Sequence, residues 1–208
     1  MKHVMSMIAM LAFLAGCSSE DTNAVQADLP VDKGTVKAGA GNTVMMKGGA
    51  LPLAGKGVVE VGKPLPSAIL STNALKPVNI ADAGGKVRII SVVPSIDTPT
   101  CDKQTHELSE ENGGLDEQVE LITVSMDLPF AQSRFAKEAN INNVTFLSDY
   151  NSREFGSNNG LIIEPLGLLA RAVIVTDKDN VVRYLQVVPE VTALPDMQAA
   201  MDAARALI

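Results

Sequence analysis

Apolar and polar positions alternate in blocks along most of this 208-residue chain. Residues 87–93 (VRIISVV) and 119–125 (VELITVS) are nearly continuous apolar runs, which are typical of strands buried on both faces. Each run is followed by a stretch with helical spacing, one beginning near Pro99 (PTCDKQTHELSEE) and one at 128–139 (LPFAQSRFAKEA). Thr98 suits an N-cap, and Pro99 suits the first turn of a helix. This part of the chain therefore predicts a β-α-β-α order, with Phe130 and Phe135 of the second helix as core contacts.

The flanking segments extend this order in both directions. TVMM at 43–46 and VVEV at 58–61, separated by a segment with Gly and Pro, predict an N-terminal β-hairpin. VTFL at 144–147 predicts a short strand, followed by a helical or irregular stretch. Residues 171–188 (RAVIVTDKDNVVRYLQVV) predict a second hairpin that turns at DKDN, and a final helix is expected to begin near Pro195. The order predicts an α/β protein with a mixed central sheet and flanking helices, for which the thioredoxin-like fold is the natural candidate.

The N-terminus has the pattern of an export signal. After Lys2 an apolar run extends to Leu14, which is too short to anchor the chain stably across a bilayer. The run ends in Leu-Ala-Gly-Cys, which resembles the lipobox of bacterial lipoproteins; the resemblance implies cleavage before Cys17 and lipidation of that residue. Ser18 is not the Asp that marks inner-membrane retention, so we expect an outer-membrane anchor facing the periplasm. The alternative, a buried N-terminal helix, is disfavoured by the polar segment that follows.

The same pattern predicts the domain organisation. Residues 1–16 are expected to be a signal peptide. Residues 17–42 are small and polar, which is typical of a flexible tether, here beginning at the lipidated Cys17. Residues 43–208 can bury one sizeable core and are expected to form the folded domain.

Composition narrows the function classes. Removal of Lys2 with the signal peptide changes the formal net charge from −7 to −8, and aromatic residues make up only 3% of the chain. Nucleic-acid binding is disfavoured, because it needs a basic surface and often stacking rings. After processing, His106 is the only histidine, which argues against a two-histidine metal site. With Cys17 lipidated, Cys101 is the only free thiol, so no intramolecular disulfide is expected.

Cys101 lies where the strand at 87–93 gives way to the helix that begins near Pro99. Backbone N–H groups at a helix start are unpaired, and the helix dipole places partial positive charge there. Both effects favour the thiolate, which is the nucleophilic form of cysteine. A buried structural cysteine is the alternative, but a strand-to-helix junction favours a reactive one. A dithiol oxidoreductase is disfavoured, because Thr98 stands where the first sulfur of a C-x-x-C motif would be.

The residues around Cys101 resemble a known family. PSIDTPTC at 94–101 matches the P-x-x-x-T-x-x-C signature of peroxiredoxins. DLPFAQSRF at 127–135, NNV at 142–144 and GLLARAVIVTD at 167–177 resemble the thiol peroxidase subfamily, and the likeness runs from the N-terminal hairpin to the last helix. The resemblance implies a thioredoxin-like fold. It also implies reduction of hydrogen peroxide and organic hydroperoxides without a metal or organic cofactor.

The resemblance assigns roles residue by residue. Cys101 corresponds to the peroxidatic cysteine, whose thiolate attacks a peroxide oxygen and becomes a sulfenic acid. Thr98 corresponds to a threonine that hydrogen-bonds the sulfur and the peroxide, and Pro94 to a proline that shields the thiolate from water. Arg171 corresponds to an arginine that stabilises the thiolate and helps hold the peroxide. Thr98, Pro94 and Arg171 each have a structural interpretation as well, as an N-cap, a strand terminator and a surface charge, but their joint occurrence favours the functional one.

The chain departs from the family pattern at Ala136. Many thiol peroxidases carry a resolving cysteine just after SRF, where this sequence has Ala136. We therefore expect a one-cysteine cycle, in which an external thiol, either a small molecule or a thioredoxin-like protein, reduces Cys101. The alternative function is a non-enzymatic redox sensor or interaction module. Homodimers are common in the family, although nothing in the sequence alone establishes an interface.

Overall fold

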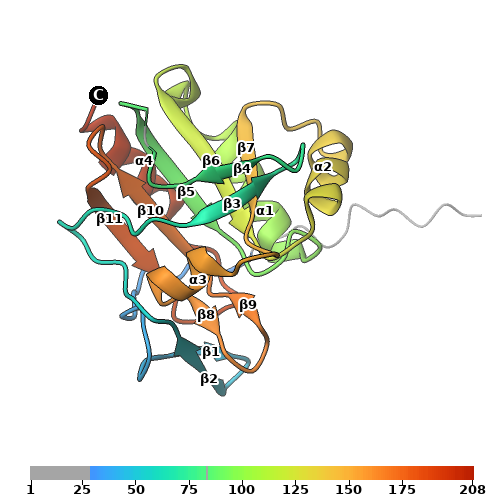
Figure 1. Cartoon of the computed structure of the whole chain (residues 1–208), viewed down its shortest axis with the longest axis vertical. Coiled ribbons are helices and arrows are strands. Elements are labelled where there is room, and N and C mark those ends of the chain that lie inside the picture. Colours follow the sequence, from blue (N-terminus) through green and yellow to red (C-terminus); the bar gives the residue numbers. More distant parts are fainter. Residues whose placement is uncertain (1–28, 83) are drawn as a thin grey trace, which may run out of the picture.

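The computed structural model describes residues 29–82 and 84–208, which form two sheets, with helices packed against the larger one (Figure 1). The larger sheet has seven strands in the order β11-β10-β5-β6-β7-β3-β4, and the smaller has four in the order β1-β2-β8-β9. The strands are β1 Thr43–Met46, β2 Gly49–Ala54, β3 Ile69–Thr72, β4 Pro77–Asn79, β5 Val87–Val92, β6 Val119–Ser125, β7 Val144–Ser148, β8 Ile162–Ile163, β9 Leu168–Leu169, β10 Ala172–Thr176 and β11 Val182–Val187. The α-helices are α1 Pro99–Glu110, α2 Pro129–Glu138, α3 Glu154–Asn159 and α4 Met197–Arg205, with a 3-10 turn at Leu115–Glu117.

The centre of the large sheet is the strand β5. It pairs in parallel with β6 and antiparallel with β10, so the large sheet is mixed, as the sequence predicted. Every residue of β5 and of β10 is buried. Strands covered on both faces need apolar side chains in both orientations, which explains the nearly continuous apolar runs in their sequences.

Helices cover both faces of the large sheet. On one face a core cluster joins residues of α1 and α4 to alternate strand positions, with α2 at its side; its members include Leu108, Met201, Ile89, Leu121 and Val173. On the other face the intervening strand positions pack against α3 and the small sheet; members of this cluster include Ile90, Ile122, Ile174, Phe155 and Val44. The period of two along each strand separates the two sets.

The predicted helices are confirmed at Pro99–Glu110, Pro129–Glu138 and Met197–Arg205. The sequence of α2 also suggested that both of its phenylalanines contact the core. Phe135 does so, but Phe130 is 64% exposed, and that part of the expectation was wrong. Phe130 lies in the first turn of the helix on its solvent side, so the helical spacing that places Phe135 inward places Phe130 outward.

The N-terminal hairpin exists, but its second strand differs from the expected one. β1 pairs with Gly49–Ala54 across a two-residue turn, whereas residues 58–61 form no strand. The turn residues Lys47 and Gly48 have φ values of 51° and 84°, the left-handed conformation that two-residue hairpin turns require. The Gly and Pro residues of this segment predict a longer loop instead of this tight turn. The short strands β3, β4, β8 and β9 were not anticipated either.

Residues 30–42 lie against the domain rather than forming part of a free tether. The Val36 N–H donates to the Val187 carbonyl at 2.9 Å, and the Leu194 N–H donates to the Pro30 carbonyl at 2.8 Å. This segment covers the outer edge of β11, whose backbone groups would otherwise lack partners. Residues 30–42, which the sequence assigned to the flexible tether, are therefore packed against the domain.

The expected signal peptide and Cys17 lie outside the described residues. Within residues 29–82 and 84–208, no helix has the length and apolar character needed to span a bilayer.

Candidate active site

Cys101 is the third residue of α1, directly beyond the buried strand β5. The helix begins at Pro99, and Thr98 occupies the N-cap with extended backbone angles, φ −117° and ψ 144°. The Thr98 carbonyl accepts the Asp102 N–H at 2.9 Å, the first hydrogen bond of the helix. The side chain of Cys101 is fully buried. The expected strand-to-helix junction is therefore confirmed, with the sulfur beneath the surface.

Arg171 lies beside this sulfur, although it comes seventy residues later in the chain. It directly precedes β10, and the antiparallel pairing of Ala172 with Val92 brings it to the end of β5. Its Nη2 donates to Cys101 Sγ at 3.4 Å, and its Nε donates to the Val191 carbonyl at 2.9 Å. The side chain is 2% exposed, which excludes the alternative of a surface charge.

The guanidinium of Arg171 has no anionic partner within ion-pair distance among the residues of the described chain. Its positive charge is therefore not neutralised by a carboxylate. A fixed cation at this distance stabilises a sulfur anion, and it stabilises negative charge that develops on an oxygen bound nearby.

Gln104 and Ser91 complete a buried chain of hydrogen bonds that the sequence did not reveal. Arg171 Nη1 donates to Gln104 Oε1 at 2.7 Å, and Gln104 Nε2 donates to Ser91 Oγ at 2.7 Å. Both residues are fully buried. Gln104 lies one helical turn after Cys101 and on the same face, so its spacing was the available signal. The amide holds the guanidinium in the orientation that directs Nη2 at the sulfur.

Thr98 and Pro94 lie in the loop between β5 and α1. The Thr98 side chain is exposed, and its hydroxyl donates to the Ser95 carbonyl at 3.2 Å rather than to Cys101. Pro94 is buried at the end of β5. The fold thus brings Arg171 into contact with Cys101, whereas Thr98 is a close neighbour whose hydroxyl points elsewhere.

Known proteins resemble this chain over nearly all of its described length. The Redoxin family model matches residues 60–201. A thiol peroxidase of Halalkalibacterium halodurans is 45% identical over 166 residues, which make up 80% of this chain and 99% of that protein. A thiol peroxidase of Staphylococcus aureus is 44% identical over 160 residues, or 77% of this chain and 96% of that one. The chain belongs to the Redoxin family.

A solved structure agrees with this assignment. A peroxiredoxin-like protein from Aquifex aeolicus matches with a TM-score of 0.75 at 39% sequence identity, covering 82% of this chain and 99% of that one. The predicted thioredoxin-like peroxiredoxin fold is confirmed. The high identity to thiol peroxidases also confirms a peroxiredoxin-type enzyme and disfavours the alternative of a non-enzymatic module.

Ala136 lies in α2 and is half-buried against the core cluster that joins α1 and α4 to the large sheet. Cys101 is the only free cysteine among residues 29–82 and 84–208. Within this part of the Redoxin fold, no second thiol is available to a sulfenic acid at Cys101.

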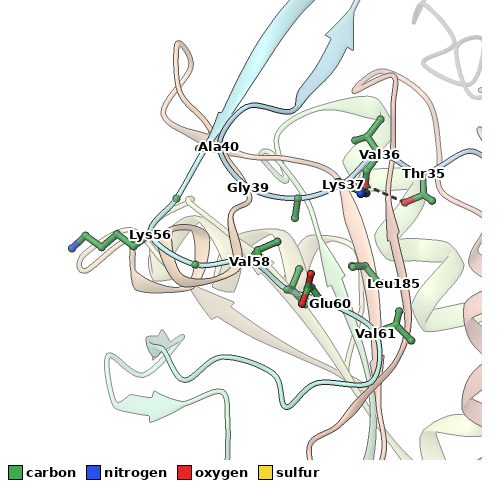
Figure 2. A pocket seen from close by; sticks show the side chains of 14 residues that line it. Thr35, Val36, Lys37, Gly39, Ala40, Lys56, Val58, Glu60, Val61 and Leu185 are labelled. Carbon is green, nitrogen blue, oxygen red and sulfur yellow. Dashed lines mark hydrogen bonds between the residues drawn. The ribbon is translucent and has the colours of Figure 1, made fainter.

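A cavity of about 850 Å³ lies away from the thiol, between residues 35–40 and 55–61, with Leu185 of β11 at its edge (Figure 2). Figure 2 shows Lys56 extending outward from it. No residue of the cysteine site lines this cavity. A smaller cleft of about 470 Å³ lies beside the cysteine loop, with Thr98 and Phe135 in its lining.

His106 also lines this cleft, but its ring is held by two carboxylates of its own helix. Its Nδ1 lies 2.7 Å from Glu110 Oε1, and its Nε2 lies 3.4 Å from Asp102 Oδ1. No group of three or more His, Cys, Asp or Glu side chains in the described part of the chain could hold a metal ion. His106 is therefore part of a partly exposed surface network rather than of the thiol site.

Proposed function

We propose that the protein reduces hydrogen peroxide and organic hydroperoxides with Cys101 as its only reacting sulfur. The observation that carries this proposal is the contact between Arg171 and Cys101. A buried guanidinium without a carboxylate partner donates one N–H to Sγ at 3.4 Å. Such a cation supports both a thiolate nucleophile and an oxygen leaving group.

In the first half of the cycle, the Cys101 thiolate attacks the nearer oxygen of the peroxide. The S–O bond forms as the O–O bond breaks, and the leaving oxygen takes a proton from solvent, giving a sulfenic acid and an alcohol or water. Negative charge moves from sulfur to the leaving oxygen during this step. The Arg171 guanidinium, fixed by Gln104 and Val191, stabilises that charge without reorganising.

Thr98 and Pro94 have supporting roles in this proposal. The Thr98 hydroxyl reaches the sulfur or the peroxide only after it leaves the Ser95 carbonyl, to which it now donates. Side-chain rotations of exposed residues are fast, so this hydrogen bond need not slow the reaction. The buried Pro94 shields the thiolate from water at the end of β5.

In the second half of the cycle, an external thiol regenerates the enzyme. The first thiol attacks the sulfenic sulfur and releases water, leaving a mixed disulfide on Cys101. A second thiol attacks that disulfide, which releases reduced Cys101 and an oxidised reductant. The absence of a second cysteine from the described residues supports this route.

Rapid mixing of the full chain with hydrogen peroxide or cumene hydroperoxide tests the activity. We expect second-order consumption of peroxide by the wild type and by Cys17→Ser, and its loss in Cys101→Ser. Equal rates in the wild type and Cys101→Ser would overturn the proposal.

We also propose that Cys17 carries a lipid that tethers the enzyme to a bacterial membrane on its periplasmic side. The support is the sequence Leu-Ala-Gly-Cys at the end of a short apolar run. A tethered enzyme would lie beside lipid hydroperoxides. We expect the wild type, but not Cys17→Ser, to incorporate labelled palmitate in cells and to sediment with membranes; equal labelling of the two proteins would contradict the proposal.

A further inference from the structure

The loop that covers Cys101 is held by a carboxylate that has no role in the cycle described above. This cysteine loop, residues 94–98, joins β5 to α1. Asp127 follows β6 and accepts two hydrogen bonds from it: Ser95 Oγ donates to Oδ1, and the Ile96 N–H donates to Oδ2, both at 2.8 Å. Both carboxylate oxygens are therefore used to hold one loop.

Asp127 is itself fixed to the frame of the sheet. Its N–H donates to Ser125 Oγ at 3.3 Å, and its carbonyl accepts the hydroxyl of Ser148. Ser125 and Ser148 end the neighbouring parallel strands β6 and β7. The carboxylate is thus a rigid anchor at the carboxyl ends of three adjacent strands.

The held loop controls the surroundings of the sulfur. Ile96, whose N–H is bound by Asp127, packs directly against Cys101, together with Val93. The Ser95 carbonyl accepts the Thr98 hydroxyl, so fixing Ser95 also fixes the orientation of Thr98. Among the described residues, the only side chain outside the loop that hydrogen-bonds residues 94–98 is Asp127.

The burial of Cys101 makes this anchor consequential. The sulfur is fully buried, with Ile96 of the loop packed against it. An external thiol is bulkier than hydrogen peroxide and must approach the oxidised sulfur in line. Access of such a thiol to Sγ therefore requires that the loop move away, and the two hydrogen bonds to Asp127 oppose that movement. Hydrogen bonds to a charged acceptor are stronger than those between neutral groups.

We propose that Asp127 is a positioning residue that latches the cysteine loop over Cys101. Its two hydrogen bonds set the balance between a closed form, which shields the thiolate and orients Thr98, and an open form, which admits the external thiol. The importance of the latch for turnover rests on the proposed function. Its effect on access to Cys101 does not.

Alkylation of reduced Cys101 by iodoacetamide tests the latch without peroxide. The rate is measured against pH in Cys17→Ser, so that only one thiol reacts. The plateau at high pH reports access to the thiolate, whereas the midpoint reports its charge surroundings. We expect Asp127→Ala to raise the plateau about tenfold or more, and Ser95→Ala to raise it severalfold. Asp127→Asn keeps an acceptor for the Ile96 N–H and a donor for Ser95 Oγ, so it should restore most of the closed behaviour.

Two matched variants separate the latch from charge and from general destabilisation. Asp97→Ala removes an exposed carboxylate from the same loop without breaking either bond, so its plateau should equal that of the wild type. Gln186→Leu removes a buried amide that binds Asp32 and Gly34 far from the loop, so it should lower stability without raising the plateau.

Unchanged plateaus in Asp127→Ala and Ser95→Ala would overturn the proposal. If Asp127→Ala does not fold, Ser95→Ala decides alone, because it keeps the bond to Ile96. If the wild type showed no peroxidase activity, the proposed function would be contradicted, but the alkylation rates would still test the latch. In an active enzyme, Asp127→Ala and Ser95→Ala should react more slowly with hydrogen peroxide, because the closed form shields the thiolate and orients Thr98. The same two variants should be reduced faster by an external thiol, because the open form admits it.

Discussion

Two buried arginines, Arg88 and Arg171, lie at opposite ends of the same antiparallel strand pair. Arg88 pairs with Thr176 at one end of β5 and β10, and Arg171 lies just beyond the pairing of Ala172 with Val92 at the other. They are 1% and 2% exposed. In the sequence both interrupt apolar runs, VRIISVV and LLARAVIV, so their burial alone distinguishes neither.

Their hydrogen-bond partners distinguish them. Arg88 donates to Thr176 Oγ1, to the Ile80 carbonyl and to Asn180 Oδ1, so that each of its three nitrogens binds a neutral oxygen. Burial lowers the pKa of its guanidinium, an effect that the charges of Glu120 and Asp82 oppose. A buried charge satisfied by fixed neutral acceptors joins segments of the fold.

Arg171 differs in one bond. Two of its nitrogens bind neutral oxygens of Gln104 and Val191, and the third donates to the sulfur of Cys101. The sulfur is the only one of these six acceptors that can become an anion. The comparison teaches that a buried arginine indicates an active site when one of its N–H groups donates to an acceptor that can become an anion, as Cys101 Sγ can.

The largest expected effect is on catalysis at Arg171. Arg171→Met keeps the approximate volume but removes the positive charge from Cys101. We expect the second-order rate with hydrogen peroxide to fall about a hundredfold or more, comparable with losing a transition-state donor. Stopped-flow mixing measures this rate, and circular dichroism verifies the fold. Arg171→Lys should be intermediate, because it keeps a point charge without the planar fork. A rate within about twofold of the wild type would remove the distinction between the two arginines.

The matched change at Arg88 should affect stability instead. Arg88→Met leaves Ile80, Thr176 and Asn180 without their donor in a buried site. We expect the free energy of unfolding to fall by about 3 kcal/mol. Urea denaturation measures it. The peroxide rate of the folded variant should stay within about twofold of the wild type, and a large loss of rate would show that Arg88 also serves the site.

Asp149 extends the comparison to a buried anion. It is fully buried, and its oxygens accept the N–H groups of Phe155 at 3.1 Å and Gly156 at 2.8 Å. Burial raises its pKa from 3.8 to about 6, and these two N–H groups only partly offset the shift. The folded state therefore binds the proton more tightly than the unfolded state.

The sign of the pH dependence follows from that shift. The contribution of Asp149 to stability is most favourable below pH 4 or so, decreases as pH rises toward about 6 and is constant above it, a difference of about 2 to 3 kcal/mol. Asp149→Asn should flatten this part of the profile without changing the peroxide rate. Urea midpoints across this pH range measure it. An unchanged profile would show that another group titrates there.

The smallest effect is expected at Gln104. Gln104→Leu removes the amide that orients the Arg171 guanidinium but leaves the charge in place. We expect about a tenfold loss in the peroxide rate, the equivalent of about 1.4 kcal/mol in the transition state. Gln186→Leu, an equally buried glutamine away from the thiol, is the control and should lose stability alone. Equal rates in the two variants would show that Arg171 holds its orientation without Gln104.

The sequence predicted those features that depend on local patterns. The strand at β5 and the helix from Pro99 follow from an apolar run and from Thr98-Pro99, and together they place Cys101 at a helix start. The match to the peroxiredoxin signature is local as well. By contrast, the first hairpin was paired wrongly, because the turn at Lys47-Gly48 depends on left-handed backbone angles that non-glycine residues rarely adopt.

Other features depend on tertiary pairing and were not predictable from spacing. Residues 30–42 have no apolar period, yet they cover the edge of β11 because that edge needs partners. The contacts of Arg171 with Gln104 and of Asp127 with Ser95 join segments far apart in the chain. The orientation of the Thr98 hydroxyl is a rotamer choice between nearby acceptors, which no sequence pattern determines.

The oxidation state of Cys101 after a single turnover tests the central claim most directly. The reduced full chain is mixed with one equivalent of hydrogen peroxide, trapped with a sulfenic-acid reagent and analysed by mass spectrometry, before and after addition of an external thiol. We expect one oxygen atom on Cys101, followed by a mixed disulfide with the added thiol and then by reduced Cys101. A disulfide between Cys101 and Cys17 would contradict the claim that Cys101 is the only reacting sulfur. An unmodified Cys101 after the peroxide has been consumed would contradict the claim that Cys101 reacts at all.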